Sequence, residues 1–260
     1  MTGPASYDER HERLARLVHE AGSVVALTGA GISVPSGIPD FRTPQTGVWA
    51  NVDPMEVAHV DVWRRDPRRF WAFYGHRFAV LGDVRPNGAH EALVELERRG
   101  RLDAVLTQNI DLLHEKAGSR DVVELHGSIA GTHCPACGAR ASLEETLQRI
   151  EGAEDGVPRC VECGGVLKPD VVLFGDMLPV AAIERAEQLA AGADVLLCIG
   201  SSLVVYPVAE LPRTTLRHRG RVAIVTASET PYDELAAVRL DGDVVAELQG
   251  LLAALDALEG

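Results

Sequence analysis

Two pairs of cysteines have the spacing of a metal site. Cys134 and Cys137 form one Cys-x-x-Cys pair, Cys160 and Cys163 form a second, and 22 residues separate the two pairs. Four thiolates with this spacing are typical of a tetrahedral zinc site, which has no open coordination position for a substrate. Two disulfides or a chance spacing are the alternatives, but disulfides would require an oxidising compartment, and chance seldom produces two such pairs. The sequence therefore predicts one structural zinc ion, and the reaction chemistry must lie elsewhere in the chain.

A second feature is the glycine-rich segment Gly29-Ala30-Gly31, which directly follows the apolar run 23–28. Glycines at the carboxyl end of a buried strand let the backbone approach a pyrophosphate group, whose oxygens the N–H groups can bind. The third glycine of the usual dinucleotide-binding pattern is absent, and so is a clear acidic residue about 20 positions later. By spacing alone, dinucleotide binding and an ordinary tight turn are equally supported.

Three side chains of different chemistry follow this segment, namely Asp40, Phe41 and Arg42, directly after Pro39. The guanidinium of Arg42 can bind a phosphate through paired donors, and the ring of Phe41 can cover an apolar or cationic ring. A buried phenylalanine beside a surface ion pair would give the same sequence, so both interpretations stay open at this point.

Polar residues also follow the apolar run 103–107, where Gln108, Asn109 and Asp111 stand. Open α/β sheets bind ligands at the carboxyl ends of their strands, and an amide with a carboxylate could recognise a carboxamide there. Equally, asparagine and aspartate in this position could cap the next helix.

Two more apolar runs end in residues that could act on a nucleotide. His126 follows the run 122–125 and is placed to be a general base near neutral pH, although one histidine of nine is more often structural. The run 194–199 is followed by donors suited to a phosphate or a ribose, namely Gly200, Ser201 and Ser202.

Runs of strand length alternate with helical patterns along much of the chain. Strands are predicted at 23–28, 103–107, 122–125, 171–174, 194–199 and 221–226, and helices at 88–99, 180–191 and 243–258. This alternation predicts an α/β fold, with a parallel sheet that helices cover on both faces. A first helix is predicted over residues 7–21, with a capping box formed by Ser6 and Glu9.

Two segments interrupt the alternation. Residues 45–85 contain all three tryptophans and predict a helical insert, whereas residues 129–168 contain the paired cysteines and predict a small zinc-binding module. The main domain then consists of the segments 1–44, 86–128 and 169–260.

Composition and charge argue against several classes of function. The formal net charge of −13 disfavours direct binding to nucleic acid, and it suits either a cationic peptide partner or simply solubility. The sequence has no run of about 18 apolar residues, so it predicts no membrane span. The first residues also lack the apolar stretch of a signal peptide. We therefore expect a cytoplasmic protein, in which Cys198 is a buried apolar residue rather than a ligand.

Taken together, these motifs resemble the sirtuin family of NAD-dependent protein lysine deacylases. The matching stretches are GAGISVPSGIPDFR, TQNIDLLHEKAG, LHG, the two cysteine pairs, LKPDVVLFGD and GSSLVVYP, in family order over about residues 24–207. The resemblance implies a large Rossmann-like domain, a smaller inserted zinc module and a cleft between them. It also implies NAD as a consumed co-substrate.

The resemblance implies a role for each matched residue. Gln108 would contact the ribose next to nicotinamide. His126 would be the general base, and Asn109 would be the second catalytic residue. The pocket for the nicotinamide ring would be shaped by Asn109, Ile110 and Asp111. The rest of the NAD site would involve Ala30, Asp40, Phe41, Arg42, Gly200, Ser201 and Ser202.

Two further expectations concern the substrate and the adenosine ribose. Val172 and Phe174 would line an apolar tunnel for the acyl-lysine. Sirtuins usually carry an asparagine at the end of the run 221–226, where this chain has Thr226. Threonine keeps a hydroxyl but lacks the amide, so we expect weaker or rearranged ribose contacts there.

In the reaction that the resemblance implies, the acyl oxygen attacks C1′ of the nicotinamide ribose. Nicotinamide leaves in this step. His126 then takes a proton from the ribose hydroxyls, which lets a ribose oxygen attack the acyl carbon, and water completes the release of the unmodified lysine side chain and O-acyl-ADP-ribose. No side chain of the enzyme becomes covalently bonded, because the enzyme contributes placement, exclusion of water and one base.

Tyr74 and Arg77 bear on the choice of acyl group. Sirtuins that remove succinyl or malonyl groups carry a Tyr-x-x-Arg pair at a similar place, and an arginine fork can bind a carboxylate through two hydrogen bonds. An exposed arginine on an amphipathic helix is the alternative. We expect removal of acetyl groups and also of acidic acyl groups.

Two other functions use the same motifs: transfer of ADP-ribose to a protein, and non-enzymatic sensing of NAD or ADP-ribose. The intact His126, Asn109 and Asp111 speak against a sensor, and ADP-ribosyl transfer would leave the acyl tunnel without a purpose. The expected partners are acyl-lysine proteins or peptides, with neither nucleic acid nor membrane, and we expect a monomer.

Overall fold

The computed structural model describes residues 8–40 and 52–260. The predicted cap residue Ser6 and the predicted NAD-site residues Phe41 and Arg42 lie outside these ranges. Among the described helices, none is long and apolar enough to cross a membrane.

The larger part of the molecule is built on a parallel sheet, as the alternation of runs predicts. Its strands lie in the order β3-β2-β1-β7-β8-β9, and all neighbouring pairs are parallel. The bounds are β1 Val24–Thr28, β2 Ala104–Thr107, β3 Val122–Glu124, β7 Val195–Ile199, β8 Arg221–Val225 and β9 Val238–Leu240. The order reverses between β1 and β7, which is where open α/β sheets bind ligands.

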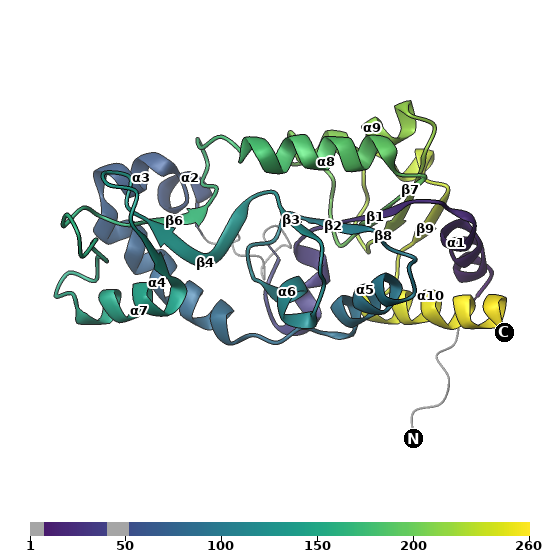
Figure 1. Cartoon of the computed structure of the whole chain (residues 1–260), viewed down its shortest axis with the longest axis horizontal. Helices are drawn as coiled ribbons and strands as arrows, with labels where there is room; N and C mark the ends of the chain where they lie inside the picture. Colours follow the sequence, from purple (N-terminus) through teal and green to yellow (C-terminus); the bar gives the residue numbers. More distant parts are fainter. Residues whose placement is uncertain (1–7, 41–51) are drawn as a thin grey trace, which may run out of the picture.

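Helices cover both faces of this sheet (Figure 1). Side chains alternate along each strand, so Val24 and Ala26 of β1 point to one face, and Val25 and Leu27 to the other. The first face is covered by α1 Glu9–Glu20, α5 Gly88–Arg98 and α10 Val244–Glu259. The second face is covered by α8 Val180–Gly192 and α9 Leu211–Arg217. Because both faces are buried, the central strands β1 and β7 are buried at every residue and are almost entirely apolar, and the predicted fold class is confirmed.

The predicted capping box of the first helix is wrong. α1 begins at Glu9, and its N-cap is Asp8, whose carboxylate accepts hydrogen bonds from the backbone N–H groups of Arg10 and His11 at 2.9 and 3.2 Å. His11 completes the box, because its Nδ1 accepts from the Asp8 N–H at 3.2 Å. A histidine thus takes the place that glutamate or glutamine holds in the usual motif.

A smaller lobe lies at the opposite end of the molecule from α1 (Figure 1). Its three-stranded sheet has the order β5-β4-β6, with antiparallel pairs. The strands are β4 Gly127–His133, β5 Arg140–Ser142 and β6 Lys168–Val171, and the helices are α2 Pro54–Val57, α3 Val60–Arg65, α4 Pro67–Asp83 and α7 Leu143–Gly152.

The helical segment and the cysteine-bearing segment share one core in this lobe. Phe70, Trp71 and Phe78 of α4 pack in the same buried cluster as Ile129 of β4 and Leu173 after β6. The two segments that the sequence separates therefore stabilise one another in space.

The run 171–174 is not a strand of the large parallel sheet. It begins in β6 of the small antiparallel sheet, and Phe174 then pairs with His59 in an isolated parallel bridge. Val171 and Leu173 are buried in the core of the smaller lobe. An apolar run shows that a segment is buried, but it does not show which core buries it.

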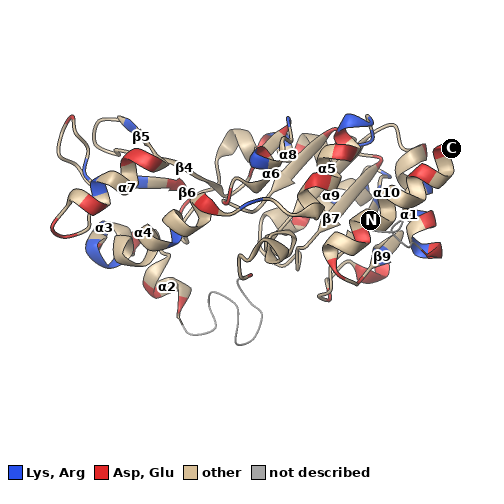
Figure 2. Cartoon of the chain, turned by 90° about the horizontal axis from the view of Figure 1, so that it is seen from below, with Lys and Arg blue, Asp and Glu red and all other residues tan. Residues whose placement is uncertain are grey.

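Acidic and basic residues are interspersed on the helices of both lobes (Figure 2). The net negative charge of the sequence is thus spread over the molecule rather than gathered on one element.

Candidate active site

Two loops meet where the strand order reverses. Thr28 of β1 pairs with Ile199 of β7, so the segments after these strands leave the sheet side by side. The Gly29 N–H donates to the Ile199 carbonyl at 3.0 Å, and the Gly31 N–H donates to the Gly200 carbonyl at 2.8 Å. The sheet thereby brings together two segments that are far apart in the sequence.

The contact between these loops requires glycine. A Cβ on Gly31 would lie 2.7 Å from the Gly200 Cα, and a Cβ on Gly29 would lie 2.9 Å from the Gly200 carbonyl oxygen. Gly200 also has a φ of +60°, in the left-handed region. From the sequence, these glycines are explained by the approach of a pyrophosphate. The structure gives a second reason, because the two loops pack too closely for a Cβ at these positions.

A network of polar side chains lies at the same edge of the sheet. The Gln108 amide donates to the Ser201 hydroxyl at 2.9 Å and to the Thr28 carbonyl at 3.3 Å. The Asn109 amide donates to the Gly29 carbonyl and to the Ser33 hydroxyl, both at 3.1 Å. The structure therefore unites Gln108, Asn109, Gly29 and Ser201 in one hydrogen-bonded site.

Asp111 is the buried carboxylate of this site. It accepts from the Ser33 hydroxyl at 2.7 Å and from the Leu113 N–H, at the start of α6 Leu113–Ala117, at 3.0 Å. Burial raises the pKa of Asp111, and these hydrogen bonds to the carboxylate oppose that rise. Asp111 therefore binds the start of a helix and also contacts Ser33 of the glycine-rich segment, whereas recognition of a carboxamide stays a prediction.

Ser33 is a site residue that the sequence analysis did not single out. It is buried, and its hydroxyl lies between Asn109 and Asp111. The only signal was its place two residues after Gly31 in the glycine-rich segment.

His126 lies next to this network, directly before β4. Its Nδ1 is 3.0 Å from the Gln108 carbonyl oxygen. A carbonyl oxygen can only accept, so Nδ1 carries the proton, and Nε2 is the atom that can take up another one. Burial lowers the pKa of His126, and the hydrogen bond to Gln108 only partly offsets this effect. The imidazole is therefore neutral near pH 7, as a general base must be.

The start of β4 fixes the backbone of His126. Gly127 has a φ of +70°, and a Cβ there would collide with the Asp170 carbonyl oxygen of β6. The Val172 N–H donates to the His126 carbonyl at 2.8 Å. The predicted base and the predicted tunnel residue Val172 are thus joined through one backbone contact.

Phe174 stands at the other end of the segment that contains Val172. Its N–H donates to the Ala58 carbonyl at 3.0 Å, and its carbonyl accepts from the Val60 N–H at 2.9 Å. The side chain of Phe174 remains 46% exposed. The helical part of the smaller lobe thus holds the backbone of Phe174, and a large part of its side chain reaches the surface.

Tyr74 and Arg77 lie one turn apart on α4. The Tyr74 ring packs between those of Phe70 and Phe78, with centroids 4.7 and 5.2 Å away, and burial raises the pKa of Tyr74. The Arg77 guanidinium lies 3.6 Å from the ring centroid of Phe73 and donates to the Phe73 carbonyl at 3.0 Å. Burial lowers the pKa of Arg77.

The remaining predicted residues surround the two loops to different degrees. Thr226 follows β8, is buried, and donates from its N–H to the Leu240 carbonyl at 3.0 Å. Partial burial is found for the others that the structure describes, namely Ala30, Asp40, Ile110 and Ser202. Of these, Ile110 packs against the core of the smaller lobe, so it links the two lobes at the site.

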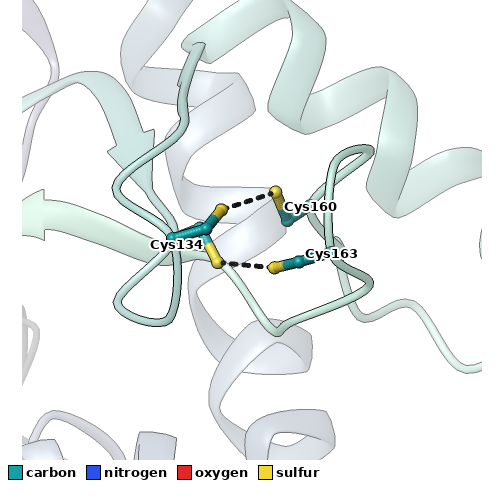
Figure 3. A group of neighbouring side chains, drawn as sticks. Cys134, Cys160 and Cys163 are labelled. Carbon is teal, nitrogen blue, oxygen red and sulfur yellow. Dashed lines mark hydrogen bonds between the residues drawn. The ribbon is translucent and has the colours of Figure 1, made fainter.

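Four cysteine sulfurs converge in the smaller lobe, those of Cys134, Cys137, Cys160 and Cys163. Figure 3 labels Cys134, Cys160 and Cys163. The sulfur of Cys134 is 3.4 Å from that of Cys163, the sulfur of Cys137 is 3.6 Å from that of Cys160, and all four lie within 4.8 Å of one another. Disulfide sulfurs would be about 2 Å apart, so the disulfide alternative is wrong. Tetrahedral zinc at about 2.3 Å from each sulfur places sulfurs about 3.8 Å apart, which fits this arrangement.

Comparison with known proteins identifies the family of the chain. Residues 29–207 match the model of the Sir2 family. An NAD-dependent protein deacetylase of Caldivirga maquilingensis is 45% identical over 253 residues, which cover 95% of this chain and 96% of that protein.

Two solved structures are similar over almost the whole fold. A Sir2 complex with a p53 peptide and NAD+ superimposes with a TM-score of 0.85 at 39% identity, covering 92% of this chain and 95% of that one. A Sir2 variant with deacetylated p53 peptide and 3'-O-acetyl ADP ribose gives 0.87 at 38% identity, covering 96% and 98%. The chain described here belongs to the Sir2 family.

Proposed function

We propose that this protein is an NAD-dependent protein lysine deacylase, which transfers the acyl group of a modified lysine to ADP-ribose. The observation that carries the proposal is the orientation of His126, whose Nδ1–H is bound by the Gln108 carbonyl so that Nε2 can act as a base. Related proteins named as NAD-dependent deacetylases, and a relative's structure with deacetylated peptide and acetylated ADP-ribose, support the same chemistry.

The ADP part of NAD would bind over the two loops at the carboxyl ends of β1 and β7. Backbone N–H groups in such loops can hold phosphate oxygens, and hydroxyl groups can bind a ribose. The residues that we assign to this part of the site are Gly29, Ala30, Gly31, Asp40, Phe41, Arg42, Gly200, Ser201, Ser202 and Thr226.

The nicotinamide end would lie against Asn109, Ile110 and Asp111, with Gln108 at the adjoining ribose. Asn109 and Asp111 are held by Ser33 from the glycine loop, so their positions are set before any ligand arrives. Preorganised polar groups of this kind need little rearrangement during a reaction. NAD, when bound, supplies the electrophilic ribose carbon.

His126 acts after nicotinamide has left. Its Nε2 takes a proton from a ribose hydroxyl, and the freed oxygen can then attack the acyl carbon. Val172 and Phe174 would hold the acyl-lysine beside it, and the connection from Val172 to His126 keeps base and substrate in register. The zinc site holds the smaller lobe together and takes no part in these steps.

Product analysis tests this proposal. The wild-type chain, incubated with NAD and an acetyl-lysine peptide, should yield the deacetylated peptide, nicotinamide and O-acetyl-ADP-ribose. His126→Ala should lower deacylation at least about 100-fold, because it removes the base. It should keep exchange of labelled nicotinamide into NAD, since that step precedes the proton transfer.

A matched control is His218→Ala, which removes an exposed histidine of the larger lobe. It should leave both reactions unchanged. ADP-ribose found attached to protein instead of acetyl-ADP-ribose would favour the transferase alternative. Bound but unconsumed NAD would favour a sensor, and either result would contradict our proposal.

We further propose that the acyl range includes succinyl and malonyl groups. The supporting observation is that Tyr74 and Arg77 lie on one face of α4, with Tyr74 in the same core cluster as Ile110. The Arg77 guanidinium is held in place by the ring and the carbonyl of Phe73, and a guanidinium fixed in this way is suited to binding a carboxylate.

Arg77→Met should reduce turnover of a succinyl peptide at least about 10-fold relative to an acetyl peptide, because a charge-assisted pair is lost. Arg69→Met is the control, since Arg69 lies on the same helix and pairs with exposed Glu56. Equal loss on both peptides, or no loss on either, would rule out a carboxylate clamp.

We also infer that the protein acts as a cytoplasmic monomer. None of the five cysteines forms a disulfide, which is consistent with a reducing compartment. A net charge of −13 opposes self-association. Light scattering of the purified chain would report a dimer if this inference is wrong.

A further inference from the structure

A tight turn follows β6 and contains one of the proposed tunnel residues. We call Leu173–Asp176 the acyl turn. The Asp176 N–H donates to the Leu173 carbonyl at 2.9 Å, and the Leu173 N–H donates to the Asp176 carboxylate at 3.2 Å. Gly175 has a φ of +84°, in the left-handed region. Asp176 thus binds Leu173 twice: its backbone N–H donates to Leu173, and its side chain accepts from Leu173.

The same carboxylate forms an ion pair with the start of the strand. The Lys168 Nζ lies 2.9 Å from the Asp176 carboxylate, and the two side chains are only 14% and 19% exposed. The ammonium group also donates to the Val171 carbonyl at 3.2 Å. Little water therefore screens this pair, and loss of either partner leaves the other charge half-buried without its counterion.

The opposite side of the acyl turn rests on the helical part of the smaller lobe. A Cβ on Gly175 would lie 2.6 Å from Nε2 of His59, so the turn and the imidazole are in direct contact. The backbone of Phe174 is hydrogen-bonded to Ala58 and Val60. The acyl turn is thus held between the ion pair on one side and the segment 58–60 on the other.

We propose that Lys168 and Asp176 are positioning residues for the acyl-lysine. This inference rests on the proposed function and deepens it. The ion pair fixes the backbone of the acyl turn, and through it the exposed ring of Phe174 and the tie from Val172 to the His126 carbonyl. Neither charged group touches the reacting atoms. Their loss should therefore weaken peptide binding and leave the NAD loops intact.

Steady-state kinetics with an acetyl-lysine peptide test the proposal, using Lys168→Met, Asp176→Asn and the double variant. Each single variant should raise the KM for the peptide at least about 10-fold, because small misplacements of a substrate site are costly. The KM for NAD should stay within about twofold. The double variant should be no worse than the poorer single variant, since both changes remove the same interaction.

Two controls keep the result interpretable. Arg99→Met removes a comparably buried pair with Glu95 on α5, in the larger lobe, and should change neither KM. Lys168→Arg keeps the charge and should retain most of the peptide affinity. Asp176→Asn keeps the shape of the side chain, so it tests the charge even if Lys168→Met does not fold.

An unchanged peptide KM in folded Asp176→Asn would overturn the inference, and so would an equal rise in both KM values. A wild-type chain that removes no acyl group would instead overturn the proposed function. The two failures are distinguishable, because the first is seen only where the wild type deacylates the peptide.

Discussion

His126 obtains its tautomer from a backbone carbonyl rather than from a carboxylate. A carboxylate partner would stabilise the charged imidazolium and raise the pKa of the histidine. The Gln108 carbonyl orients the ring but raises the pKa of His126 much less. The effect of burial is larger, so the pKa is lowered. The imidazole is thereby oriented and unprotonated at neutral pH, as the proposed role of a base requires.

The pH dependence of activity follows from this. Since the pKa of His126 is lowered, the histidine stays neutral until the pH falls below its ordinary value of about 6.5. We expect kcat/KM for the acyl peptide to be level above about pH 6.5 and to decline only below it. Initial rates at subsaturating peptide, across a pH series, measure this limb.

Glu124 must be separated from His126 in that experiment. It precedes the Leu125-His126 pair, and burial raises its pKa to about 6. Glu124→Gln should leave the position of the acidic limb unchanged if His126 is the titrating base. A limb that disappears in this variant would assign the pH dependence to Glu124 instead.

Much of the site could be predicted residue by residue, but not how its residues contact one another. The motifs identified Gln108, Asn109 and Asp111 because polar groups followed an apolar run. They did not show that Ser33 joins Asn109 to Asp111, since that contact depends on the course of the loop after β1. The spacing of residues along the sequence does not show how a loop folds back on itself, and so it does not show which of its side chains meet.

At the scale of elements, β4, β5 and β6 depend on the cysteine cluster. Cys134 follows β4 directly, and Cys134 and Cys160 are buried together with Ala141 of β5 and Leu167 before β6. The cluster has few apolar residues, so a bound metal would supply much of its stability.

Removal of the metal should therefore loosen the smaller lobe selectively. We expect one zinc per chain, and Cys137→Ser should lose most of it because three ligands bind the metal more weakly than four. Amide hydrogen exchange should then accelerate in β4 and β5 and stay slow in β1 and β7. Zinc content and exchange are measured on the same samples.

Cys198→Ala serves as the control, since Cys198 is buried in β7 and lies in the core of the larger lobe. It should retain its zinc. A Cys137→Ser chain with full zinc content, or with unchanged protection of β4, would show that the four sulfurs do not form the site.

Elements were predictable where one pattern had one interpretation. The strands β1, β2, β7 and β8 and the helices α5, α8 and α10 agree with prediction to within a residue or two at each end. The prediction that the run 171–174 is a strand of the parallel sheet is wrong, because this run is buried in the core of the smaller lobe. No apolar run marks the short strand β9, because Arg239 stands between Val238 and Leu240.

At the scale of the whole molecule, the two lobes are each assembled from separated parts of the chain. The sequence predicts two inserts, and the structure packs them around one core. The sheet order brings the loops after β1 and β7 together at the reversal point, so the site exists only when both lobes and both halves of the sheet are complete.

The position of β1 at the centre of the sheet has a consequence for synthesis of the protein. A nascent chain finishes β1 at Thr28, yet its central partner β7 begins only at Val195. Until β7 leaves the ribosome, one side of a strand that is fully buried in the folded protein has no neighbour, and such an edge favours aggregation. Polypeptides released before residue 195 should therefore be clients of chaperones or of proteolysis, however well their smaller lobe has formed.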